Sequence, residues 1–151
     1  MKRTICLLLA AVMVLALAAC GAGNANSGKQ TASAYLNQTE GAAVYVTADL
    51  SGGWSMEFAR GAAYLYDGEI TAGKDAVAIL LTLDKDVYED HLAAAMDDQN
   101  HKEASGGVFF AYDENTTAFL TALNDSAYVL IETKDKANAE AIVARFTLEL
   151  D

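Results

Sequence analysis

The fold is decided by the stretch AVAILLTL, residues 76–83, which is apolar at every position except Thr82. A run of this length is typical of a central β-strand that is covered on both faces, although its periodicity does not exclude a buried helix. On either side of the run the sequence shows several short strand patterns, separated by turn signals, with few helical segments between them.

The segment that follows the run predicts a helix. Asp86 and Glu89 have the spacing of a capping box, so we expect the helix to begin there. Asp97 and Asp98 should mark its end, because carboxylates are disfavoured near a helix C-terminus. One stripe of side chains at helical spacing should form its inner face, namely Val87, Tyr88, His91, Leu92, Ala95 and Met96.

Two alternating segments before the run predict a β-hairpin. Apolar and polar side chains alternate over residues 44–50 and again over residues 54–58, and Ser51-Gly52-Gly53 separates the two segments. A three-residue loop places the apolar side chains of both strands on one face. The cross-strand pairs would then be Leu50 with Trp54, Ala48 with Met56, and Val46 with Phe58.

The sequence after the predicted helix contains a second β region, which Gly106-Gly107 opens. Residues 108–112, 117–123 and 127–133 have the spacing of a meander of short antiparallel strands. Asp135 can cap a last helix, whose inner face would carry Ala141, Ile142, Arg145 and Phe146.

Strands that occur in runs, with few helices between them, indicate an α+β domain. We expect about six short strands in one or more antiparallel sheets, together with two helices. Residues 75–96 align without gaps on residues 125–146, strand over strand and helix over helix. This alignment fits two similar halves, each a β-meander with a helix, and shared patterning explains it equally well.

The N-terminus carries an export signal. Met1-Lys2-Arg3 is basic, and residues 5–19 after it contain no charged side chain. This uncharged run is too short for a membrane-spanning helix and has the length of a signal-peptide core. The sequence Leu17-Ala18-Ala19-Cys20 then resembles the lipobox of bacterial lipoproteins. This resemblance implies cleavage before Cys20 and acylation of its thiol with diacylglycerol. The alternative is an ordinary signal or anchor in which Cys20 is incidental.

The lipobox resemblance divides the chain into three parts. Residues 1–19 would be the signal peptide, residues 20–41 the lipidated cysteine and a flexible linker, and residues 42–151 one α+β domain. The linker prediction rests on residues 21–34, which contain no apolar side chain larger than alanine. The expected location is the extracytoplasmic face of the cell membrane, or the periplasmic side of an outer membrane if the cell has one.

The charge of the chain excludes one class of partner. The full chain has a net charge of −11, and the loss of Lys2 and Arg3 with the signal leaves 8 basic and 21 acidic side chains, a net charge of −13. Nucleic acid affinity comes mainly from Lys and Arg contacts to phosphates, so we expect no nucleic-acid partner. The membrane should be reached through the lipid anchor alone.

A polar loop supplies the candidate metal ligands Asp97, Asp98, His101 and Glu103. These side chains could gather a cation, but their spacing matches neither an EF-hand loop nor a helical zinc pair. A solvated polar loop explains the same residues and is the favoured interpretation.

Tyr64 and Tyr66 share one face of a predicted strand, beside the turn signal Asp67-Gly68. If Leu65 points inward, both rings stand exposed and could contact a glycan or a protein of the envelope. The alternative, which is favoured, is a sheet with both faces buried.

Catalytic and cofactor-binding motifs are absent from the sequence, so no catalytic residue and no cofactor are predicted. We therefore expect a non-enzymatic binding or interaction module of the cell envelope. The alternative is a small envelope hydrolase or metal-binding protein that uses His101 and the nearby carboxylates. A structural or inhibitory domain that acts through a sheet edge is a third hypothesis.

Overall fold

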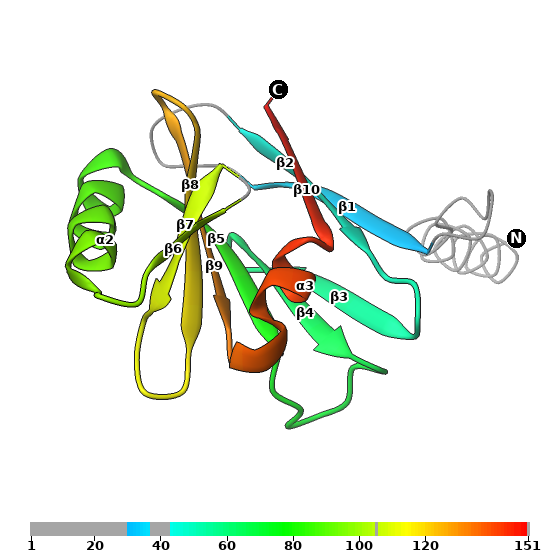
Figure 1. Ribbon diagram of the computed structural model, residues 1–151. Helices are drawn as coiled ribbons and strands as arrows, with labels where there is room; N and C mark the ends of the chain where they lie inside the picture. The colour runs from blue at the N-terminus through cyan, green and yellow to red at the C-terminus, as the bar shows by residue number, and fades with distance from the viewer. Residues whose placement is uncertain (1–29, 37–42, 105, 151) are drawn as a thin grey trace, which may run out of the picture.

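The computed structural model describes residues 30–36, 43–104 and 106–150, and these form two antiparallel sheets with two α-helices (Figure 1). The larger sheet has seven strands in the order β3 (Trp54–Ala59), β4 (Ala62–Asp67), β5 (Ala78–Leu83), β9 (Ala127–Thr133), β8 (Thr117–Asn124), β7 (Gly107–Ala111) and β6 (Lys102–Ala104). The smaller sheet has the order β1 (Thr31–Leu36), β2 (Val44–Asp49) and β10 (Phe146–Leu150). The helices are α2 (Lys85–Asp97) and α3 (Ala139–Val143), and the 3₁₀ helix η1 (Lys136–Asn138) precedes α3.

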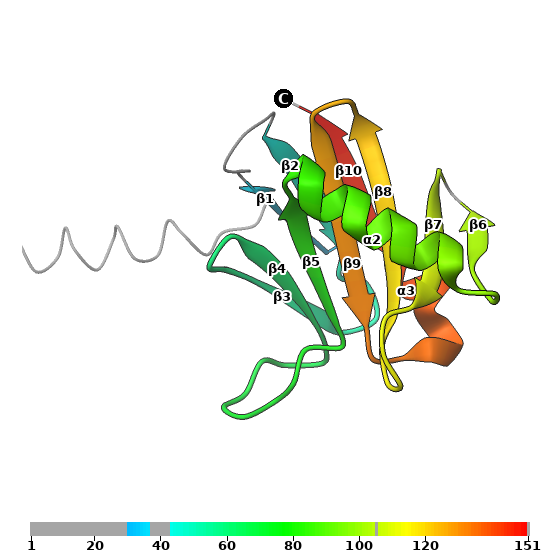
Figure 2. The same cartoon turned by 90° about the vertical axis from the view of Figure 1, so that its left-hand side faces the viewer.

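The elements pack in layers, with the seven-stranded sheet in the middle. Helix α2 crosses one face of this sheet, where it contacts β7, β8 and β9 (Figure 2). The three-stranded sheet and α3 cover the opposite face (Figure 1). The apolar residues form two clusters, one between the two sheets and a smaller one under α2. The expected antiparallel sheets and two helices are therefore confirmed, and the architecture, mainly β with some helix, is consistent with the α+β class.

The central strand and its helix were predicted correctly in kind. Strand β5 pairs with β4 on one side and β9 on the other, as expected for a covered strand. Helix α2 ends at Asp97 as expected, but it begins at Lys85. The residue at its N-cap is Asp84, whose side chain makes no capping hydrogen bond, so the predicted capping box at Asp86 and Glu89 is wrong.

The predicted hairpin between residues 44–50 and 54–58 is also wrong. Strand β2 pairs with β1 and β10, whereas β3 pairs with β4 through the turn Arg60-Gly61. Gly52 and Gly53, with φ of +85° and +88°, carry the chain from one sheet to the other. Both strands still turn apolar side chains toward the same core, because the two sheets face each other. Alternation identifies such strands but does not show whether they are paired or stacked.

The number of strands was underestimated, since the described residues contain ten rather than about six. One of the additional strands is β1, which lies within the linker expected at residues 20–41. Its backbone pairs with β2 from Thr31 opposite Asp49 to Leu36 opposite Val44. Small polar residues can form an edge strand because the ladder uses backbone groups and needs few apolar side chains. The ordered domain therefore includes residues 31–36, ahead of the predicted boundary at residue 42.

The two strand–helix units that align in the sequence lie next to each other. Strands β5 and β9 are neighbours in the large sheet, each followed along the chain by a helix. The two helices pack on opposite faces of that sheet, α2 over one cluster and α3 within the other. No helix in the described part of the chain is both long and apolar enough to span a membrane.

Candidate functional site

The predicted metal ligands are not brought together. Asp98 accepts hydrogen bonds from the backbone N–H groups of Asn100 and Ala111, each at 2.9 Å, and its carbonyl oxygen lies 2.7 Å from Nδ1 of His101. These backbone bonds lower the pKa of Asp98, so its carboxylate holds the loop after α2 against β7. Within residues 30–36, 43–104 and 106–150, no three His, Cys, Asp or Glu side chains are placed to hold a metal ion. The geometry therefore does not support a site at Asp97, Asp98, His101 and Glu103.

The two candidate tyrosines do not form an exposed pair. Leu65 is buried on the inner face of the sheet as expected, but Tyr66 is only 8% exposed and Tyr64 is half-buried. The Tyr66 hydroxyl lies 3.5 Å from Oε2 of Glu57. Burial and this carboxylate raise the pKa of Tyr66. The favoured alternative, a sheet with both faces buried, therefore describes the surroundings of Tyr66.

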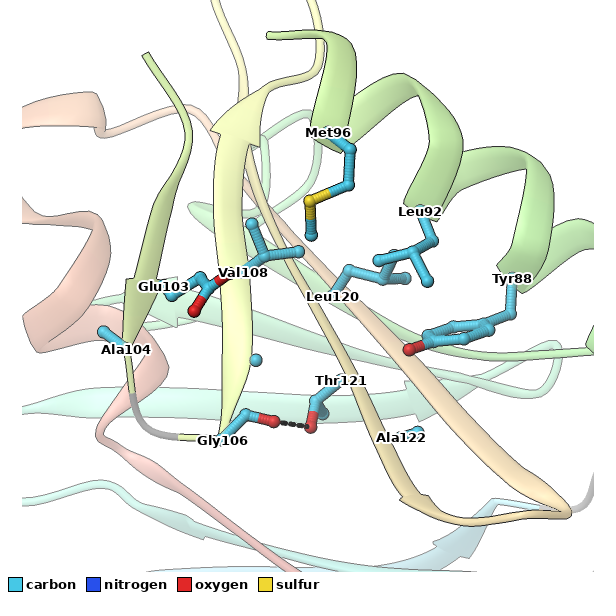
Figure 3. A pocket seen from close by; sticks show the side chains of 11 residues that line it. Tyr88, Leu92, Met96, Glu103, Ala104, Gly106, Val108, Leu120, Thr121 and Ala122 are labelled. Carbon is cyan, nitrogen blue, oxygen red and sulfur yellow. Dashed lines mark hydrogen bonds between the residues drawn. The ribbon is translucent and has the colours of Figure 1, made fainter. Parts of the chain in front are cut away.

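A groove under α2 is the candidate site that the structure itself supplies. It is an open cavity of about 500 Å³ between α2 and strands β6, β7 and β8. From the helix, Tyr88, Leu92 and Met96 point toward the sheet, and Val108 and Leu120 form the floor (Figure 3). Further lining residues come from the strands and their turns, namely Glu103, Ala104, Gly106, Gly107, Thr121 and Ala122.

Small side chains on the sheet leave the space that forms the groove. Ala104, Gly106, Gly107 and Ala122 present little or no side chain to the helix. At Gly107 a larger residue is excluded, because a Cβ atom would lie 2.4 Å from the carbonyl oxygen of Leu120. Ala95 is the one residue of α2 that is fully buried, whereas its neighbour Met96 is 45% exposed above the groove. The groove is thus built into the packing of α2.

Two side chains of the groove are held by specific contacts. The Thr121 hydroxyl donates a 3.0 Å hydrogen bond to the carbonyl oxygen of Gly106, shown as a dashed line in Figure 3. The ring of Tyr88 stacks on Tyr128 with centroids 4.5 Å apart, and burial with this neighbour raises the pKa of Tyr88. Among the described residues, the lining contains no Lys, Arg or His, and Glu103 is the one charged side chain. The groove therefore combines an apolar floor with polar edges, one of which is acidic.

A second cavity, of about 680 Å³, lies beside Trp54. The Arg145 guanidinium stacks 4.3 Å from the centre of the Trp54 ring and donates hydrogen bonds to the carbonyl oxygens of Asp49 and Ser51. Lys134 on the same cavity forms an ion pair with Asp75. These contacts tie the loop after β2 to the end of α3, so the polar groups here serve the fold.

Sequence reasoning found the helical side of the groove and the two strands of its floor. Tyr88, Leu92 and Met96 belong to the predicted stripe, and β7 and β8 correspond to the strands expected at residues 108–112 and 117–123. Strand β6 was not predicted, so the wall that it forms was missed. The signal that could have located it is the glycine pair Gly106-Gly107, which leaves space beside the stripe.

No protein-family model matches the chain, and no curated protein or solved structure matches it either. Its possible functions therefore have to be argued from the residues and their arrangement.

Proposed function

We propose that this chain is a lipid-anchored protein of the cell envelope, and that its groove binds an apolar part of a ligand. The anchor is supported by the resemblance of Leu17-Ala18-Ala19-Cys20 to a lipobox. These four residues lie outside the part of the chain that the structure describes. Two or more acyl chains on Cys20 would give stable attachment without a transmembrane helix.

The observation that carries the binding function is the open apolar groove beside Met96. Its volume of about 500 Å³ lies within the range of small-molecule and side-chain binding sites. Ligand sites are concave and lined mainly by apolar and aromatic side chains, and this groove is lined by Tyr88, Leu92, Met96, Val108 and Leu120. Met96 adds to this because its unbranched, polarisable side chain adapts to partners of different shape.

The alternative function, a hydrolase or metal-binding protein using His101, has no described contact in its favour. The His101 ring is engaged with the backbone of Asp98, and the neighbouring carboxylate of Asp98 accepts two backbone hydrogen bonds. The other histidine, His91, lies 5.6 Å from the ring of Tyr112, measured between centroids. Both imidazoles thus contact structural neighbours.

The binding function is tested with the full-length chain and Nile red, an uncharged apolar dye whose fluorescence rises in apolar surroundings. Ala122 lines the groove and is exposed, so Ala122→Trp should fill the groove without disturbing the core. We expect this variant to bind the dye about tenfold more weakly. The matched control is Ala94→Trp, an exposed position on α2 outside the groove, which should bind as the parent does. Equal dye binding by the parent and Ala122→Trp, with unchanged circular dichroism, would contradict the proposal.

A further inference from the structure

We infer that the occupant of the groove is a basic amphipathic segment of a partner polypeptide, with apolar side chains in the groove and Lys or Arg side chains against its rim. This inference rests on the proposed function and specifies the ligand of the same site. Two features of the surface carry it, namely its charge and its open shape.

The elements that border the groove carry a net negative charge. Residues 84–103, which span α2 and most of β6, contain seven acidic side chains and two lysines, and of these acids Glu103 lines the groove itself. Both lysines are already paired, Lys85 with Glu89 at 3.6 Å and Lys102 with Glu140 at 2.6 Å. Glu140 lies on α3, which packs on the other face of the sheet, so Lys102 does not offset the charge at the groove. A cationic partner would meet an uncompensated negative surface here.

The position of the charges relative to the groove defines the pattern of the partner. Glu103 on β6 lines one side, and the exposed Met96 lies on the other side at the C-terminal end of α2 (Figure 3). The carbonyl groups at a helix C-terminus carry partial negative charge, which adds to that of Glu103. In a segment whose apolar side chains are flanked by Lys or Arg, the apolar side chains would therefore contact the floor and the basic side chains would contact the rim.

The same features disfavour lipid as the occupant. Fatty acids and the common anionic lipids carry negative headgroups, and the lining residues include no basic side chain to receive one. In helix-in-groove recognition a peptide lays its apolar face into a groove, and the groove under α2 offers Leu92, Val108 and Leu120 for such contacts with Glu103 at its edge.

The inference is tested with a dye-labelled peptide of about 15 residues, made of leucine and lysine at helical spacing. Fluorescence anisotropy with the full-length chain should show saturable binding that weakens as salt is added, because the rim contacts are screened. Two control peptides separate the contributions. One has every lysine replaced by glutamate, and the other has every leucine replaced by serine. We expect both to bind at least about tenfold more weakly.

Variants of the chain locate the binding. Glu103→Lys should lower the affinity for the leucine–lysine peptide about tenfold and reduce the salt dependence of binding. The matched control is Glu69→Lys, an exposed charge reversal in the loop between β4 and β5, which should leave binding unchanged. Ala122→Trp should weaken the binding of both the peptide and the uncharged dye.

Three results would overturn the inference. These are equal binding of the glutamate peptide, equal effects of Glu103→Lys and Glu69→Lys, and binding of phosphatidylglycerol vesicles in preference to the peptide. Dye binding distinguishes a failure of this inference from a failure of the proposed function. If Ala122→Trp weakens dye binding but the leucine–lysine peptide does not displace the dye, then the groove binds ligands and only the partner class is wrong. If Ala122→Trp leaves dye binding unchanged, the proposed function itself fails.

Discussion

Ala95 and Met96 are adjacent residues of one helical stripe, yet Ala95 is fully buried and Met96 is 45% exposed. The sequence predicts the stripe as a whole, because apolar spacing identifies the side of a helix that turns toward a core. It does not predict how closely each member approaches the sheet, since that depends on the size of residues on the opposite strands. At Gly106, Gly107 and Ala122 those residues are small, and the stripe becomes one wall of the groove.

Glu132 provides a prediction about stability. This half-buried carboxylate lies on β9, opposite Ile79 of β5 and Ala118 of β8. Burial raises its pKa above the ordinary value of 4.5, His91 on α2 opposes the shift, and Asp113 adds to it. An acid whose folded pKa is raised binds protons more tightly in the folded state, so stability falls as the pH rises from the unfolded value through the folded one.

Glu132→Gln should therefore stabilise the protein near pH 7, because the uncharged amide avoids the cost of burying a carboxylate. Near pH 3, where the carboxyl group is protonated in both states, the difference should disappear. Urea unfolding at the two pH values measures this. Glu149→Gln, at an exposed position of β10, is the control and should change stability near pH 7 by less than Glu132→Gln does. A Glu132→Gln variant that is less stable than the parent near pH 7 would contradict this explanation.

At the scale of elements, sequence patterns identify strands better than they identify partners. The run at residues 76–83 correctly predicts a central strand, because a strand covered on both faces is apolar at nearly every position and eight residues is a typical strand length. The segments around Val46 and Met56 were identified as strands but paired wrongly, since they face each other across a core. Strand β1 was missed because its first four residues, 31–34, are small and carry no alternation of large apolar side chains. Strand β6 is three residues long and carries no periodic signal.

The packing of α2 on the sheet gives a prediction about stability at this scale. Ala95 is fully buried in the cluster between the helix and the sheet, so Ala95→Leu would overpack this contact and should destabilise the protein by about 1–3 kcal/mol. Ala94→Leu places the same side chain on the exposed side of the helix and should change stability by less than about 0.5 kcal/mol. Urea unfolding measures both free energies. Equal effects would show that α2 does not depend on this contact.

The whole molecule combines a layered domain with a proposed anchor. The groove under α2 and the three-stranded sheet lie on opposite faces of the large sheet, so β1, the described strand nearest to Cys20 in sequence, is on the side away from the groove (Figures 1 and 2). A domain attached through its N-terminal side could therefore present the groove to a partner while the lipid holds it at the membrane.

The anchor predicts the behaviour of a cysteine variant in bacterial cells. Cys20→Ser should abolish incorporation of labelled palmitate and release the protein from the membrane fraction, since the acylated thiol is lost. Cys6→Ser is the matched control, because Cys6 lies in the predicted signal core and should leave labelling intact. Labelling that persists in Cys20→Ser would exclude Cys20 as the acylated residue.

The central claim, that the groove between α2 and β6–β8 is the binding site, is tested most directly by methyl NMR of the methionines in the full-length chain. Met96 lies at the groove, whereas Met56 packs against the core between the sheets and serves as an internal reference. On titration with the leucine–lysine peptide, we predict a saturable shift of the Met96 methyl signal while the Met56 signal stays in place. A titration that shifts Met56 and leaves Met96 unchanged, or one that shifts neither, would contradict the claim.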